Sequence, residues 1–258
     1  MKVDKLRTVI IYIIIILLGL VCLLPLLNIV AISFSSSAAV EGNMVGLIPV
    51  GFSTAAYKKI LEDSQFWHSF LISVERVVLA LIINFVLIVL MAYPLSKTNA
   101  QFRGRNIYAN LMIFAMLFNG GMIPTFLVVK SYGLLNTVWA LVLPGAVPIF
   151  NVILVMNFFA AVPKELEEAA FIDGANPFQV LTKIFIPISK PVLATVSLFS
   201  IVGSWNDFYS GLIYMSKAAY YPLMTYIQSL QINVEDLIKQ GNLSAVVDSS
   251  PAVACKQL

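Results

Sequence analysis

Most of the residues that could do chemistry in this sequence lie inside long apolar runs. Seven polar side chains fall within these runs: Asn84, Asn110, Asn119, Asn151, Asn157, Asn206 and Asp207. Polar groups are costly to place in lipid, so they tend to face the interior of a helix bundle or a water-filled path. Hydrogen bonds between helices explain such residues equally well. Their chemistry is therefore hydrogen bonding, either between helices or to a polar solute.

Other common kinds of site are missing from the sequence. The only histidine is His68, so a metal site built from several histidines is excluded. No G-x-x-x-x-G-K-[ST] occurs, and the chain therefore does not bind ATP through a P-loop. No constellation of nucleophile and base supports a membrane-embedded enzyme. Any energy for work must come from another chain.

The composition explains why these polar residues are few. The 258 residues are 60% hydrophobic and 11% charged, with a mean hydropathy of +0.91. A soluble domain carries about 25% charged residues. The net charge of +3 is too small to suggest nucleic acid as a partner. The sequence therefore predicts an integral membrane protein and excludes a soluble enzyme.

Five apolar runs reach the length of about 20 residues that a membrane-spanning helix needs. They extend over about Val9 to Ile32, His68 to Leu95, Ile107 to Val129, Asn136 to Val162, and Pro191 to Met215. The first run is longer than the apolar region of a signal peptide, about 7–15 residues, so we expect it to be retained. We predict an all-α, polytopic transmembrane bundle that forms a single domain over residues 1–258.

Basic residues near the ends of the runs predict the orientation. One set of short segments holds nine of them: Lys2, Lys5, Arg7, Lys97, Arg103, Arg105, Lys164, Lys183 and Lys190. The opposite set holds six, spread over a longer stretch of sequence. The amino terminus is therefore expected in the cytoplasm. Near the outer end of the second run, Glu75 and Arg76 are expected to extend their side chains to the interface, with an ion pair or contact with an external protein as the alternatives.

The segment 163–187, which we call the elbow, joins the fourth and fifth runs on the cytoplasmic side. Pro163 suits the first turn of a helix, and three glutamates follow it at the positive end of the helix dipole. Gly174 can end this helix in a left-handed turn. Asn176 can cap a second helix, with Pro177 at its first position and Gln179 three residues after the cap. The local pattern predicts two short helices joined by a glycine turn.

The spacing within the elbow resembles the EAA signature of ABC-importer permeases. Glu168-Ala169-Ala170, Gly174, Ile184 and Ile186-Pro187 match the pattern EAA-x3-G-x9-I-x-L-P, with isoleucine in place of leucine. Further segments, among them Asn119 to Thr125, Ile172 to Ala175 and Trp205-Asn206, resemble the second permease of maltose-type carbohydrate importers. Within that group they look like the subgroup for complex, uronate-containing oligosaccharides.

This resemblance implies a complex in the bacterial inner membrane. Its other members would be a second permease, a pair of cytoplasmic ATPases that hold ATP and magnesium, and an external sugar-binding protein. The chain itself would bind no cofactor. The residues expected to form the coupling helix at the ATPase are Glu168, Ala169, Ala170, Asp173, Gly174 and Ala175. The family also implies a sixth span, which would begin near Ser249, so a truncated, non-functional permease is an alternative.

A sugar passage through the membrane would need amide and aromatic groups. Asn151, Trp205, Asn206 and Asp207 are candidates for lining it, although hydrogen bonding between helices is the competing interpretation. An ion- or proton-coupled carrier or channel would instead need ionisable residues at mid-membrane. Asp207 alone gives that alternative little support.

Overall fold

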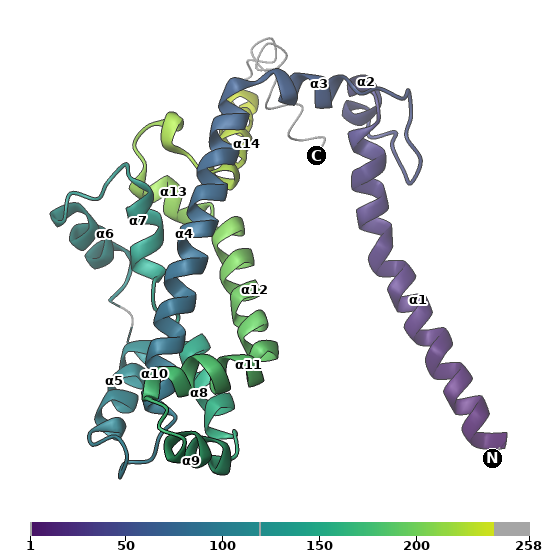
Figure 1. Cartoon of the computed structure of the whole chain (residues 1–258). Helices are drawn as coiled ribbons and strands as arrows, with labels where there is room; N and C mark the ends of the chain where they lie inside the picture. Colours follow the sequence, from purple (N-terminus) through teal and green to yellow (C-terminus); the bar gives the residue numbers. More distant parts are fainter. Residues whose placement is uncertain (1, 119, 240–258) are drawn as a thin grey trace. The chain divides into compact units, whose positions relative to one another are not determined.

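The computed structural model describes residues 2–118 and 120–239, and every regular element in these ranges is a helix (Figure 1). The chain divides into two compact units. Among the described residues, the first holds those from Lys2 to Trp67 and from Ile227 to Lys239, and the second holds His68–Tyr226. The all-α class predicted from the sequence is confirmed.

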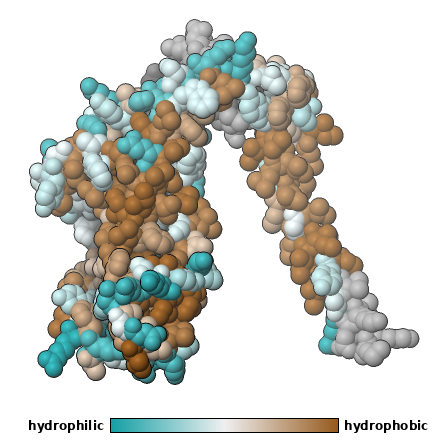
Figure 2. All heavy atoms as spheres, in the orientation of Figure 1, coloured by the Kyte–Doolittle hydropathy of each residue, from teal (hydrophilic) through white to brown (hydrophobic). Residues whose placement is uncertain are grey.

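The first unit is dominated by one long apolar helix, α1 (Lys2–Ser33). Its apolar stretch Ile10–Ser33 is 24 residues long, and most of it is exposed, whereas Ala31 and Ser33 at its end are buried. Such a stretch rises about 36 Å, which is enough to cross a hydrocarbon core of about 30 Å. Figure 2 shows the hydrophobic surface of this helix. Two short helices, α2 (Ser37–Glu41) and α3 (Ala55–Glu62), follow it.

The second unit is built around α4 (Ser64–Leu95), which packs against α8 (Ile149–Ala160) and α12 (Lys190–Asn206). One stripe of α4 is buried, and its residues recur every three or four positions: Ser69, Ser73, Arg76, Ala80, Asn84, Ile88, Ala92 and Leu95. This is the period of one helix face. Ile88, Ala92 and Leu95 join the apolar core, whereas the earlier part of the stripe is small or polar. Polar chemistry is therefore confined to one half of α4.

Three of the predicted spans correspond to pairs of helices with a sharp bend between them. The bend is 112° between α5 (Arg105–Leu117) and α6 (Met122–Ser131), where Gly121 has φ +87°. The second pair begins with Val138–Gly145, which comprises α7 (Val138–Val142) and η1 (Leu143–Gly145). The bend between this segment and α8 is 48°. Pro144 and Pro148 explain this break, because proline removes a backbone donor. Within the described residues, two helices are long and apolar enough to span a membrane, or up to five if each bent pair counts as one span.

The third bend lies at Ser189, between Pro177–Ile188 and α12, and its angle is 84°. The fifth predicted run extends to Met215, but α12 ends at Asn206 and a separate helix, α13 (Tyr209–Tyr214), follows Asp207. The described chain continues through η3 (Ala218–Tyr220) and α14 (Leu223–Lys239). The expected start of a sixth span near Ser249 lies outside the described residues.

Candidate functional site

The elbow folds as two short helices joined at a glycine. The helix α9 (Lys164–Ile172) ends before Gly174, whose φ of +80° is the left-handed conformation that glycine adopts without strain. Asn176 and Gln179 then exchange two hydrogen bonds of 2.9 Å, each from a backbone N–H to the other's side-chain oxygen. This capping box begins α10 (Pro177–Val180), which continues into η2 (Leu181–Phe185) and α11 (Ile186–Ile188). The local structure predicted for the elbow is confirmed.

One face of α9 points away from the core of the second unit. Glu165, Glu168, Ala169 and Ile172 are exposed, and they are spaced as neighbours on one helix face. Ile172 is 86% exposed, and Phe178 on α10 is 66% exposed. An exposed isoleucine and phenylalanine beside two carboxylates form a surface that can dock into a partner's groove. Of the predicted elbow residues, Glu168, Ala169, Asp173 and Gly174 are exposed, whereas Ala170 and Ala175 pack against the core.

The opposite face of α9 is tied to the end of α4. Lys97 Nζ donates to Glu167 Oε2 over 2.7 Å, and the same amine lies 4.2 Å from the ring centroids of Tyr93 and Phe185. Burial lowers the pKa of Lys97, although the hydrogen bond and negative charge of Glu167 partly oppose that effect. Sequence reasoning missed this contact, because the two charged residues are 70 positions apart.

Within the second unit, a polar cavity of about 250 Å³ lies among α4, α7, η1, α8 and α12. Its polar and aromatic lining comprises Arg76, Asn84, Asn151, Phe199, Ser200, Ser204, Asp207 and Ser210. The side-chain oxygen of Asn84 accepts from Ser200 Oγ over 3.2 Å and its amide nitrogen donates to Ala146 O over 3.0 Å, so some of these groups already bond one another. Amide, hydroxyl and aromatic groups are the ones that can hold the hydroxyls and ring faces of a carbohydrate.

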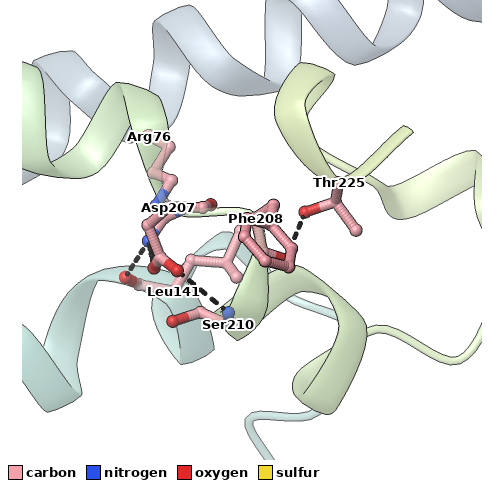
Figure 3. A network of polar contacts seen from close by, with 6 residues as sticks. All are labelled: Arg76, Leu141, Asp207, Phe208, Ser210 and Thr225. Atoms are coloured by element: carbon pink, nitrogen blue, oxygen red, sulfur yellow. Dashed lines mark hydrogen bonds and ion pairs between the residues drawn. The ribbon is translucent and has the colours of Figure 1, made fainter. Parts of the chain in front are cut away.

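Arg76 and Asp207 form an ion pair at this cavity (Figure 3). The guanidinium also donates to the backbone carbonyls of Asp207, at 2.9 Å, and Leu141, at 3.5 Å. The Asp207 carboxylate accepts from Ser210 N over 3.1 Å. Arg76 is 4% exposed, so the expectation that its side chain extends to the interface is wrong. The carboxylate of Asp207, 131 positions away in the sequence, pairs with the guanidinium and allows it to be buried.

The structure brings together only part of the passage predicted from the sequence. Asn151 and Asp207 line the cavity. Trp205 instead packs edge-to-face on Phe70, with centroids 5.9 Å apart, and Asn206 is exposed and donates to Val202 O. Arg76, Asn84 and Ser200 line the cavity but were not assigned to the passage. Asn84 is one of the seven polar residues in apolar runs, so the sequence carried a signal for it.

These features define a class: a polytopic helical membrane protein with a polar cavity inside and a projecting elbow at one end. The family model for the inner membrane component of binding-protein-dependent transport systems matches residues 2–247. The chain therefore belongs to this family. It is the permease component of an ABC importer for sugars or oligosaccharides, resident in the inner membrane, and it is not itself an enzyme. Membership implies an ATPase and a binding protein as partners.

Individual relatives agree with this assignment. The chain is 44% identical to Protein LplC of Bacillus subtilis over 214 residues, covering 83% of this chain and 72% of LplC. It is 39% identical to the polygalacturonan/rhamnogalacturonan transport system permease protein YtcP of the same organism, covering 96% of this chain and 85% of YtcP. A solved bacterial ABC transporter involved in the import of the acidic polysaccharide alginate matches with a TM-score of 0.86. The sequence identity is 31%, and the match covers 100% of this chain and 92% of that one.

Proposed function

We propose that the elbow docks into a cleft of a cytoplasmic ATPase and couples ATP hydrolysis to movement of the spans. Glu168, Ala169 and Ile172 on the outward face of α9 would make the contact, and Ala170, Asp173, Gly174 and Ala175 would shape the turn behind it. The observation that carries this proposal is that Ile172 and Phe178 are large, apolar and exposed on a helix pair whose other face is packed. The elbow would then lie in the cytoplasm, and so would the amino terminus.

The complete importer would contain this permease, a second permease, an ATPase dimer that holds ATP and magnesium, and an external sugar-binding protein. The substrate we propose is an oligosaccharide that contains uronate residues, because YtcP and the alginate importer are named for acidic polysaccharides. Arg76 is the only cation among the residues that line the polar cavity, and it forms an ion pair with Asp207. The cavity would therefore contact hydroxyls and ring faces, leaving carboxylate recognition to the partner chains.

The test of docking is co-purification. The chain is expressed with a second permease and an ATPase, extracted in mild detergent, and captured through a tag on this permease. Gly174→Pro should remove the ATPase, because proline requires φ near −65° and Gly174 has φ +80°. Gly133→Pro is a matched control: Gly133 has φ +68°, its N–H also bonds the carbonyl three residues earlier, and it lies outside the elbow.

Two results would count against the proposal. One is a parental complex that never retains the ATPase. The other is a Gly174→Pro complex that retains as much ATPase as Gly133→Pro does. For the substrate, oligogalacturonate delivered with the binding protein should stimulate ATP hydrolysis, and a neutral maltooligosaccharide of equal length should not. Equal stimulation by both would remove the acidic-sugar assignment.

A further inference from the structure

Lys97 connects three elements of the second unit. It lies two residues after the end of α4, and its amine donates to Glu167 on α9 over 2.7 Å. The same amine lies 4.2 Å from the ring centroids of Tyr93, on α4, and Phe185, on η2. The two rings pack edge-to-face with centroids 5.1 Å apart. One lysine therefore contacts the long helix and both parts of the elbow.

The Lys97–Glu167 pair is largely shielded from water. Each of the two side chains is 11% exposed. The neighbouring acids Glu165 and Glu168 are exposed, so Glu167 is the carboxylate of α9 that turns inward. Phe185 is 2% exposed and packs on Phe159 of α8, with centroids 5.4 Å apart. The pair therefore stands at the edge of the apolar core.

These contacts stabilise the junction between α9 and α4. Attraction between opposite charges is stronger in a medium of low dielectric constant than in water. A partly desolvated cation is also held over aromatic faces. Separating the two helices would leave each charge without its partner. Separation would therefore cost free energy.

We propose that Lys97 is a positioning residue that transmits displacement of α9 to α4. The inference rests on the proposed docking of α9 to an ATPase. When the ATPase moves the outward face of α9, the Glu167–Lys97 pair on its inward face carries the end of α4 with it. Arg76, which lines the polar cavity, is 21 positions before Lys97 on the chain, or about 30 Å along a helix. Movement of the elbow thus reaches the cavity through one helix.

The experiment measures movement in the intact complex and requires no sugar. Spin labels are placed at Leu71→Cys on α4 and Tyr209→Cys on α13, which are 63% and 53% exposed, with Cys22 and Cys255 replaced by serine. The distance between the labels is measured by electron–electron resonance without nucleotide and after trapping with ATP, magnesium and vanadate. The variants are Lys97→Met, Glu167→Gln, Lys97→Arg and the charge exchange Lys97→Glu with Glu167→Lys. Lys164→Met, at an exposed lysine of α9, is the control.

In Lys97→Met and Glu167→Gln, we expect the ATPase to co-purify at parental stoichiometry while the vanadate-dependent change in distance falls by more than half. Lys97→Arg and the charge exchange should restore it, and Lys164→Met should not alter it. A full change in distance in Lys97→Met would overturn the inference, and so would loss of the ATPase from both neutralising variants. Absence of the ATPase from the parental complex would instead overturn the proposed function.

Discussion

Replacing Arg76 by methionine should destabilise the second unit more than any exposed charge change does. The substitution keeps an unbranched side chain but removes a guanidinium that bonds the Asp207 carboxylate and two backbone carbonyls (Figure 3). Asp207 would then remain at the cavity without its cation. Ser210 N would still donate to the carboxylate, but a neutral donor does not replace the lost cation.

The burial of the two side chains sets the size of the effect. Removing one partner of a fully buried pair costs about 3–5 kcal/mol, whereas an exposed pair contributes about 0–1 kcal/mol. The Arg76 side chain is 5% exposed and that of Asp207 is 28% exposed, so the case lies between these limits. We expect the free energy of unfolding to fall by about 2–3 kcal/mol, a value between those two ranges. For a unit of this size, that corresponds to a fall in Tm of roughly 5–10 °C.

The assay heats detergent-solubilised protein for a fixed time and measures the surviving monodisperse fraction by fluorescence-detected size exclusion. Arg76→Met, Asp207→Asn and the double variant form a cycle, with Glu75→Gln, at the exposed neighbouring residue, as the control. The double variant should lose less than the sum of the singles, by about 1–2 kcal/mol, because contacting residues are not additive. Additive losses would show that the ion pair does not stabilise the second unit.

Three further predictions concern other positions. Gly211→Ala should lower Tm by several degrees, because a Cβ there would collide with the buried side chain of Thr225. The control is Gly203→Ala, where a Cβ meets open space, and equal Tm values for the two variants would refute the predicted collision. Ile172→Asp should reduce ATPase co-purification at least tenfold without changing Tm, because the side chain is 86% exposed; unchanged co-purification would remove Ile172 from the docking face. Asn176→Ala should speed protease cleavage of the elbow, since losing an N-cap costs about 1 kcal/mol; Asn106→Ala is the comparison.

The elbow could be predicted from the sequence because its determinants are local. The left-handed turn needs Gly174, and the capping box needs Asn176 and Gln179, three residues apart. Each signal depends on neighbours within one helical turn. The same holds for α1 and α4, whose apolar length alone indicates a span. Composition and local spacing therefore predicted the all-α class and the two helices of the elbow.

The remaining features depend on contacts between distant parts of the chain. Arg76 and Asp207 are separated by 131 positions, and Lys97 and Glu167 by 70. Read alone, a basic residue near the end of an apolar run is expected at the interface, and burial becomes favourable only when a distant carboxylate is packed against it. The bends at Gly121 and between η1 and α8 were equally hard to place, because glycine and proline permit a break without requiring one.

The Arg76–Asp207 and Lys97–Glu167 ion pairs each include a residue of α4 or one that closely follows it. The two halves of α4 therefore make different kinds of contact. The stripe of α4 that faces the cavity is small and polar up to Asn84, and from Ile88 to Leu95 it is packed into the apolar core. The packed half, continued by Lys97, holds the helix to α8 and to the elbow. On the polar half, Arg76 donates to the backbone carbonyls of Leu141 and of Asp207, the residue after the end of α12. If the elbow moves as we propose, a helix packed into the apolar core at one end and bonded by polar side chains at the other would carry that movement to the cavity wall.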